Sequence, residues 1–128
     1  MKKVLVFGTF DHLHPGHRYV LNQAAERGEL NVIIARDATV QRIKNLTPEH
    51  DEIKRKQMVQ GVCPGANVIL GDTSDYLIPV RAVNPDLILL GYDQQLPNNI
   101  TEADLGCPIE RLDAYQPHKW KSSLLRKK

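Results

Sequence analysis

The chain has 128 residues, of which 41% are hydrophobic, and its formal net charge is only +2. This length buries enough apolar surface for one domain, residues 1–128, to fold without a disulfide or a metal. The apolar runs are too short to span a bilayer, the N-terminus lacks a signal-peptide core, and the charge gives no field that attracts nucleic acid. We therefore expect a cytoplasmic protein that uses neither a membrane nor nucleic acid.

The two cysteines and the basic C-terminus each allow only a few interpretations of their role. Cys63 and Cys107 lie far apart, each before a proline and without CxxC spacing, which indicates free thiols rather than a zinc site or a disulfide. Residues 119–128 carry five Lys and Arg and no acidic residue. Such a terminus is usually a solvated tail, and the alternative is an element that binds phosphate.

Strand-like apolar runs alternate with segments of helical periodicity. The expected strands are 3–8, 30–35, 68–70, 86–91 and 109–112. The expected helices are 15–27, 38–44, about 47–60, part of 73–83 and a last one from residue 121. Residues 96–107 are rich in turn formers and predict a loop. With right-handed crossovers, this alternation predicts an α/β fold with a Rossmann-like, doubly wound, parallel five-stranded sheet.

Two of the expected helices carry signals about where they start. Thr47 is expected to cap the helix over 47–60, with Pro48 in its first position. Thr73 or Ser74 could cap the next one, but Pro79 lies well inside that span. A proline in a helix interior removes a hydrogen bond, so a short, kinked or late-starting helix is expected there.

The turn between the first strand and the first helix is the most informative stretch, and it reads GTFDHLHPGH over residues 8–17. His14 precedes Pro15, which favours an extended N-cap, and Pro15 suits the first helical position. Helix N-termini attract anions, and His14 and His17 add groups that can donate to a phosphate or hold a proton. The stretch predicts a nucleotide-handling active site; the alternative is two capped surface histidines.

The pattern Gly8-Thr9-Phe10-Asp11-x-x-His14-x-Gly16-His17 resembles the signature of the cytidylyltransferase-like nucleotidyltransferases, the superfamily with an HxGH motif. Members transfer a nucleoside monophosphate from a nucleoside triphosphate to a phosphorylated acceptor and release pyrophosphate. Further segments are similar to archaeal-type FAD synthases (FMN adenylyltransferases), and glycerol-3-phosphate cytidylyltransferases are the next match. These segments are ARDxTV from residue 35, RxxMV from 55, LGD from 70 and LGYDQ from 90.

The resemblance implies a role for individual residues. The catalytic residues it implies are His14, His17 and Lys44. The nucleotide-binding residues are Gly8, Thr9, Phe10, Gly16, Asp93, Ser122 and Ser123. The residues for the acceptor substrate are Asp11, Arg36, Lys44 and Arg55, with Asp11 near the acceptor or the metal. Ordinary alternatives stand beside some of these roles: an exposed helix-end lysine, a strand-end arginine, a surface ion pair of Arg55 with Asp51 or Glu52, and a turn-forming Asp93.

The leading hypothesis for function is therefore adenylyl transfer from ATP to FMN by a homodimer that acts on small molecules. The triphosphate implies Mg²⁺, but no dense carboxylate cluster predicts a metal cage built by the protein. Cytidylyl transfer to a phosphorylated alcohol such as glycerol 3-phosphate is the nearest alternative. A nucleotide-binding regulatory module and a nucleic-acid binder that uses the basic tail are alternatives of another kind, and the intact histidine pair favours an enzyme. No residue pattern separates adenine from cytosine.

Overall fold

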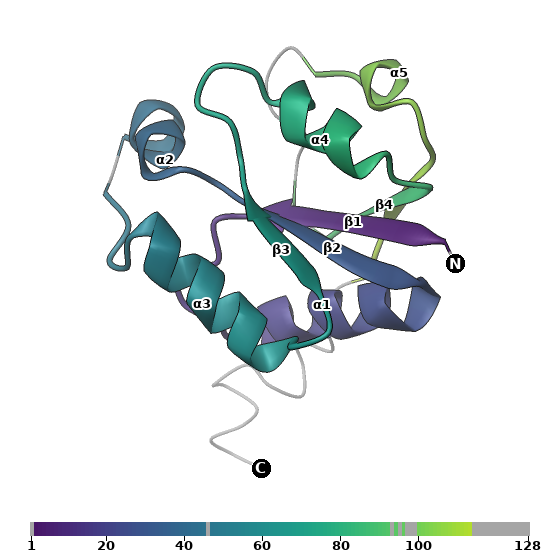
Figure 1. Ribbon diagram of the computed structural model, residues 1–128, viewed down its shortest axis with the longest axis horizontal. Coiled ribbons are helices and arrows are strands. Elements are labelled where there is room, and N and C mark those ends of the chain that lie inside the picture. Colours follow the sequence, from purple (N-terminus) through teal and green to yellow (C-terminus); the bar gives the residue numbers. More distant parts are fainter. Residues whose placement is uncertain (1, 46, 93, 95, 97–99, 114–128) are drawn as a thin grey trace.

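A five-stranded, all-parallel sheet in the order β3-β2-β1-β4-β5 forms the centre of the fold, as the computed structural model shows (Figure 1). The structure describes residues 2–45, 47–92, 94, 96 and 100–113. The strands are β1 (Lys3–Gly8), β2 (Glu29–Ile34), β3 (Asn67–Leu70), β4 (Leu87–Leu90) and β5 (Ile109–Arg111). The helices are α1 (Pro15–Arg27), α2 (Asp37–Lys44), α3 (Glu52–Val62), α4 (Leu77–Val83) and α5 (Glu102–Leu105).

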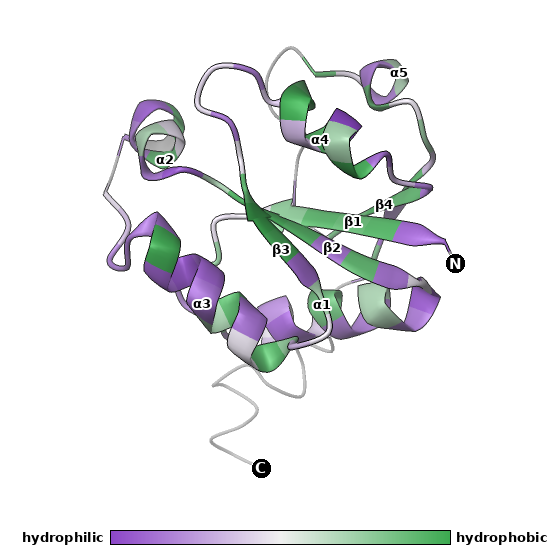
Figure 2. Cartoon of the chain, in the orientation of Figure 1, coloured by the Kyte–Doolittle hydropathy of each residue, from purple (hydrophilic) through white to green (hydrophobic). Residues whose placement is uncertain are grey.

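Helices cover both faces of the sheet, with α1 and α3 on one face and α4 and α5 on the other (Figure 1). β1 serves both layers because successive side chains of a strand point to opposite faces. Val4 and Val6 pack with the residues of α1 and α3, whereas Leu5 and Phe7 pack with those of α4 and α5. In Figure 2 the strands are accordingly mostly green, whereas α1, α2 and α3 carry many purple residues. The doubly wound parallel fold expected from the sequence is confirmed.

The strand order changes direction at β1: β2 and β3 follow on one side of it, and β4 and β5 lie on the other side. β1 pairs with β2 along its whole length, but with β4 only at Val4–Leu87 and Leu5–Ile88. Beyond Leu5, a side chain replaces the pairing with β4, because Gln94 Nε2 donates to the carbonyl oxygen of Phe7 at 2.7 Å. Such a switch point is where open α/β sheets form a crevice for ligands.

The helix expected from Thr47 begins later, and this prediction was wrong. α3 starts at Glu52, with the Asp51 carboxylate capping it through a 2.8 Å bond from the backbone N–H of Lys54. The backbone N–H groups of Glu49 and His50 donate instead to Asp11, which holds this segment outside the helix.

The segment after β3 gives a late-starting helix, as Pro79 indicates. Ser74 and Asp75 form a turn around the Asp72 carboxylate, and α4 begins only at Leu77. Pro79 thereby lies in the first turn of α4, where a missing N–H removes no intrahelical bond.

The expected loop over 96–107 contains a short helix, α5, which the sequence prediction missed. Thr101 and Asp104 form a reciprocal capping box, in which each side chain accepts from the backbone N–H of the other residue. The helix expected from residue 121 lies outside the described residues. Within the described ranges, no helix combines the length and the apolar character that crossing a bilayer requires.

Gly28 joins α1 to β2 where two backbones meet closely. The backbone N–H of Glu29 donates to the carbonyl oxygen of Lys2 at 2.7 Å, and a Cβ at Gly28 would lie 2.2 Å from that same oxygen. We expect Gly28→Ala to lower the free energy of unfolding by about 1–3 kcal/mol, measured by urea denaturation, because a backbone has to shift. Gly65→Ala is the matched control, since nothing lies within 4 Å of its added Cβ. Equal stability of the two variants would contradict the prediction.

Candidate active site

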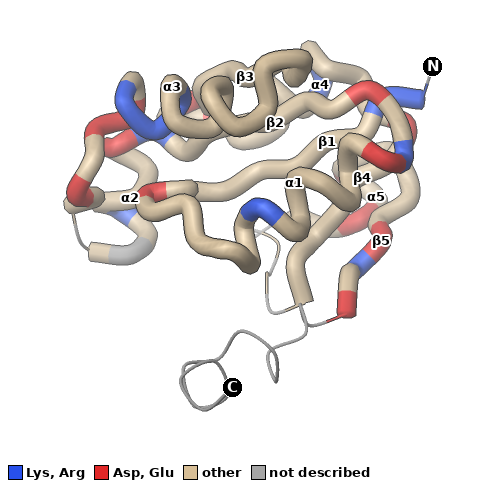
Figure 3. The backbone as a smooth tube through the Cα atoms, turned by 90° about the horizontal axis from the view of Figure 1, so that it is seen from below, with Lys and Arg blue, Asp and Glu red and all other residues tan. Residues whose placement is uncertain are grey.

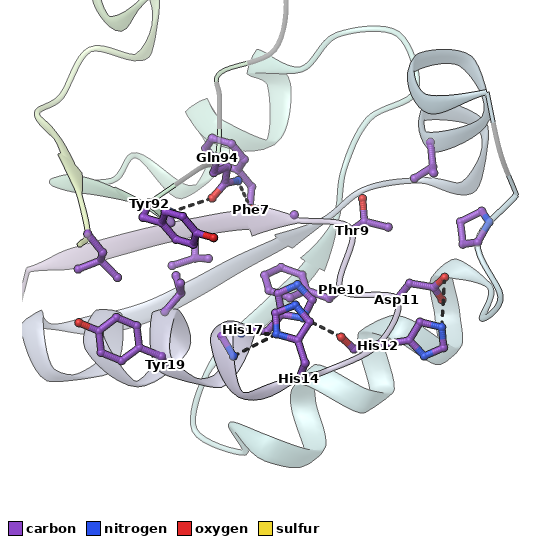
Figure 4. A pocket seen from close by; sticks show the side chains of 18 of the residues that line it. Phe7, Thr9, Phe10, Asp11, His12, His14, His17, Tyr19, Tyr92 and Gln94 are labelled. Atoms are coloured by element: carbon purple, nitrogen blue, oxygen red, sulfur yellow. Dashed lines mark hydrogen bonds and ion pairs between the residues drawn. The ribbon is translucent and has the colours of Figure 1, made fainter. Parts of the chain in front are cut away.

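A cleft of about 680 Å³ lies at the carboxyl ends of β1 and β4, at the switch point of the sheet (Figure 4). The turn that follows β1 and the first turns of α1 form one side of it. Gly91, Tyr92 and Gln94, which follow β4, form the other side. Most residues of the GTFDHLHPGH stretch therefore line one cavity.

Phe10 shapes the turn that follows β1. Its φ is 55°, in the left-handed region that non-glycine residues rarely adopt, and its side chain is only 5% exposed. The Phe10 ring lies edge-to-face with the His17 ring, at 5.3 Å between centroids. A Cβ at Gly8 would come within 3.0 Å of the Phe10 ring, so glycine at position 8 lets the ring lie under His17.

His14 caps α1. Its backbone is extended, with φ −95° and ψ 172°, and Pro15 begins the helix, both as the sequence predicts. His14 Nδ1 accepts from the backbone N–H of Gly16 at 3.0 Å and from that of His17 at 3.3 Å. Because Nδ1 accepts, the neutral ring carries its proton on Nε2. His14 therefore combines a helix-capping role with a donor at the positive end of a helix.

His17 is held by the turn in front of it. Its Nδ1 lies 2.7 Å from the carbonyl oxygen of His12, which can only accept, so this nitrogen carries a proton. The neutral ring then has its lone pair on Nε2. The rings of His14 and His17 stack with 3.8 Å between centroids and 20° between planes (Figure 4). In their neutral forms the two imidazoles carry their protons on different nitrogens, and hydrogen bonds with the backbone hold both rings at the cleft.

Asp11 connects this turn to the segment before α3. Its carboxylate accepts from the backbone N–H groups of Glu49 at 2.8 Å and His50 at 2.9 Å. Burial raises the pKa of Asp11, but the hydrogen bonds from His50 and Glu49 outweigh it and hold the pKa below its usual value. The ionised carboxylate, with its two hydrogen bonds from the backbone, therefore holds the segment before α3 against the turn that follows β1.

Arg55 is placed differently from the sequence prediction, which listed it among the residues for the acceptor substrate. Its side chain is 0% exposed. Nη1 donates to the carbonyl oxygen of Thr9 at 2.8 Å, Nε to that of His50 at 3.0 Å, and Nη2 to the Asp37 carboxylate at 2.6 Å. Its ion pair is with Asp37 and not with Asp51 or Glu52. The Arg55 side chain is therefore not accessible to a substrate, and it supports the turn after β1 through its hydrogen bond to Thr9.

Arg36 also joins elements rather than lining the cleft. Nε donates to the carbonyl oxygen of Gly71 at 2.7 Å, and Nη1 pairs with Glu52 at 2.8 Å. The second oxygen of Glu52 accepts from the backbone N–H of Asp37 at 2.8 Å. Figure 3 shows acidic and basic residues close together where α2 and the start of α3 lie, while the middle parts of β1 and β2 are tan.

The described residues do not test the roles predicted for Lys44, Asp93, Ser122 and Ser123. Lys44 is the last residue of α2, which Asn45 ends in a left-handed conformation. Asp93, Ser122 and Ser123 lie outside the described residues. Their roles stay predictions.

Several residues that line or support the cleft were given no role by the sequence analysis. Tyr92 is 56% exposed at the rim, and Gln94 links the ends of β1 and β4. Both belong to the LGYDQ segment, so position in the motif could have indicated them. His12 and His50 lie at the same edge as Asp11, and no spacing in the sequence relates His50 to the other two.

A parallel sheet with a switch-point cleft, and with stacked histidines at a helix N-terminus beside it, is characteristic of a nucleotide-binding α/β protein. Comparison with known proteins narrows this class. The cytidylyltransferase-like family model matches residues 5–127. A FAD synthase from Natronomonas pharaonis is 39% identical over 120 residues, which cover 89% of this chain and 84% of that protein. A FAD synthase from Methanosarcina mazei is 45% identical over 107 residues, which cover 82% and 69%.

A solved structure agrees with these matches. The lipopolysaccharide core biosynthesis protein from Thermoplasma volcanium GSS1 has a TM-score of 0.81 and 33% identity, covering 91% of this chain and 99% of that one. The chain belongs to the cytidylyltransferase-like family, and it is a nucleotidyltransferase. The resemblance stated from the sequence is thereby confirmed.

Proposed function

We propose that this protein is a FAD synthase, which transfers AMP from ATP to the phosphate of FMN and releases pyrophosphate. The observation that carries the proposal is similarity to several FAD synthases, at 36% to 45% identity over most of the chain. The cleft supports it, because both histidines of the HxGH motif line it together with the helix terminus that they cap.

In this reaction an oxygen of the FMN phosphate attacks the α-phosphorus of ATP, and the bond from that phosphorus to the pyrophosphate oxygen breaks. The protein needs no nucleophile, since positioning and charge stabilisation supply most of the acceleration. His14 and His17 contact the triphosphate and stabilise the charge that develops on it. Their stacking and their backbone hydrogen bonds hold both rings in place before the substrate arrives.

The other predicted residues keep their places in the proposal. The backbone of Gly8, Thr9, Phe10 and Gly16 lies beside the nucleotide, and all four residues line the cleft. Asp93, Ser122 and Ser123 extend nucleotide binding, and Lys44 adds a phosphate contact. The proposal includes a homodimer in the cytoplasm that acts on small molecules alone, and the family resemblance supports the homodimer.

Mg²⁺ belongs to the proposal as a companion of the triphosphate, whose charge it neutralises. Among the described residues, the carboxylates that line the cleft are Asp11 and Asp113. Two carboxylates are too few to surround the ion, so phosphates and water would provide most of the oxygen ligands that Mg²⁺ prefers. This donor set fits a metal that arrives with its nucleotide.

Pyrophosphate release from each combination of ATP or CTP with FMN or glycerol 3-phosphate tests the proposal. We expect release with ATP and FMN, together with FAD as the second product, and a rate at least about tenfold lower in the other three combinations. Each triphosphate without acceptor controls for hydrolysis. Preferred turnover of CTP with glycerol 3-phosphate would overturn the proposal in favour of cytidylyl transfer, and nucleotide binding without pyrophosphate release would indicate a regulatory module.

A further inference from the structure

Asp11, His12 and His50 gather at the edge of the cleft. Each of the three offers one ligand atom, and these atoms all lie within 4.8 Å of one another. His50 Nδ1 is 3.2 Å from Asp11 Oδ1, and His12 Nε2 is 3.9 Å from Asp11 Oδ2. The rings of His12 and His50 stand edge-to-face, at 5.2 Å between centroids. Two imidazoles therefore flank one carboxylate from its two sides.

These separations suit a metal centre. Zinc binds imidazole nitrogen and carboxylate oxygen at about 2.0–2.2 Å in tetrahedral sites, which places neighbouring donors roughly 3.3 Å apart. The 3.2 Å between His50 Nδ1 and Asp11 Oδ1 is close to that value. His12 Nε2 lies 3.9 Å from the other carboxylate oxygen, Oδ2, so the His12 side chain has to rotate to complete the geometry. The His12 side chain is 59% exposed and has room to rotate.

The surrounding charges also favour a cation. The Glu49 carboxylate lies 2.9 Å from His12 Nε2, so a second anion adjoins the three ligands. Asp11 is fixed by backbone N–H groups of Glu49 and His50, and such hydrogen bonds orient a ligating carboxylate. Two imidazoles with carboxylates are the donors of Zn²⁺, Co²⁺ and Ni²⁺, whereas Mg²⁺ prefers oxygen ligands throughout.

We propose that Asp11, His12 and His50 form a binding site for one transition-metal dication of the zinc and cobalt class. It is separate from the Mg²⁺ that accompanies the nucleotide and does not depend on the proposed function. His50 Nδ1 also lies 2.8 Å from the carbonyl oxygen of Asp11, so this nitrogen carries a proton in the metal-free chain. The metal takes the place of that proton when it binds. It joins the turn after β1 to the segment before α3. Because the His12 carbonyl oxygen holds His17 Nδ1, the bound metal also steadies the peptide that orients this histidine.

Metal binding to the purified full chain, stripped with a chelator, tests the site. Zn²⁺ alone is titrated by calorimetry in a buffer that holds excess Mg²⁺ throughout. We expect one equivalent to bind and the unfolding temperature to rise on binding. His12→Ala and His50→Ala should each weaken the affinity at least about tenfold and abolish most of the rise in unfolding temperature. Since His12 is exposed, its variant without metal should unfold at the temperature of the metal-free wild type, which keeps the test informative if His50→Ala folds poorly.

Cys63→Ser and Cys107→Ser are the matched controls, because thiols are also strong zinc ligands. Both should bind Zn²⁺ as the wild type does, and Co²⁺ should give visible absorption bands without the near-ultraviolet charge-transfer band of a thiolate. Absence of stoichiometric binding in the presence of Mg²⁺, or unchanged affinity in His12→Ala, would overturn the proposal. Loss of binding in a cysteine variant would do the same.

Discussion

We expect His17→Ala to lower kcat by roughly 100-fold or more while the protein stays folded. His17 lines the cleft at the N-terminus of α1, and the contact of 2.7 Å between its Nδ1 and the His12 carbonyl oxygen fixes the orientation of its imidazole ring. An alanine removes that group and leaves the helix cap intact, because the cap is the side chain of His14. Steady-state pyrophosphate release measures kcat, and circular dichroism checks the fold.

Substitutions of His14 separate capping from chemistry. His14→Ala loses both the catalytic ring and the cap, so it should also lower the free energy of unfolding by about 1 kcal/mol. His14→Asn keeps an acceptor for the N–H groups of Gly16 and His17, and it should restore the stability without restoring kcat. Near-normal turnover in His17→Ala, or in His14→Asn, would contradict the role given to the pair.

The second large effect concerns stability. Arg55→Leu should lower the free energy of unfolding by about 3 kcal/mol, because it leaves the Asp37 carboxylate and two backbone carbonyl oxygens without their donor. Asp37 is 39% exposed, so water recovers part of the loss on that side. Urea denaturation measures the change. Lys54→Ala, an exposed neighbour on α3, is the control and should stay within about 0.5 kcal/mol of the wild type.

Arg55→Lys distinguishes a brace from a phosphate ligand. Lysine keeps the charge but cannot donate to three acceptors in the planar geometry of a guanidinium, so the variant should be destabilised as well. If Arg55 instead bound the acceptor, Arg55→Lys would raise the KM for FMN and leave the free energy of unfolding unchanged. That result would restore the role that the sequence prediction gave to this residue.

The strands and the catalytic turn could be predicted because their signals are local. Buried parallel strands are continuous apolar runs, and residues 8–17 hold the cap, the proline and both histidines within a single turn. The start of α3 could not be predicted from local signals. The carboxylate of Asp11, 38 residues away from Glu49, binds the backbone N–H of Glu49 and keeps this segment out of the helix. Propensity at Thr47 and Pro48 favours a helix, and a tertiary contact overrides it.

The same limit applies to the candidate site. Arg55 reads as a surface residue among its charged neighbours Lys54 and Lys56, and only the packing of α3 against the turn shows that it is buried. The approach of His50 to His12 likewise depends on how the chain returns after α2. Residue types could indicate these side chains as candidates for a site, but the fold determines which groups they contact.

The two-sided pairing of β1 also determines the order in which the cleft can be assembled. Val4 pairs with Leu30 across one intervening helix, whereas its pairing with Leu87 has to close a loop through most of the chain. The Gln94 side chain, 87 residues from its acceptor Phe7, completes that second boundary. Closing such a distant contact is entropically costly and slow. The β1-α1-β2 unit can therefore form early, whereas the cleft forms only after β4 has paired with β1. A nucleotide therefore binds only chains whose long-range pairing is finished, and it draws the folding equilibrium toward them.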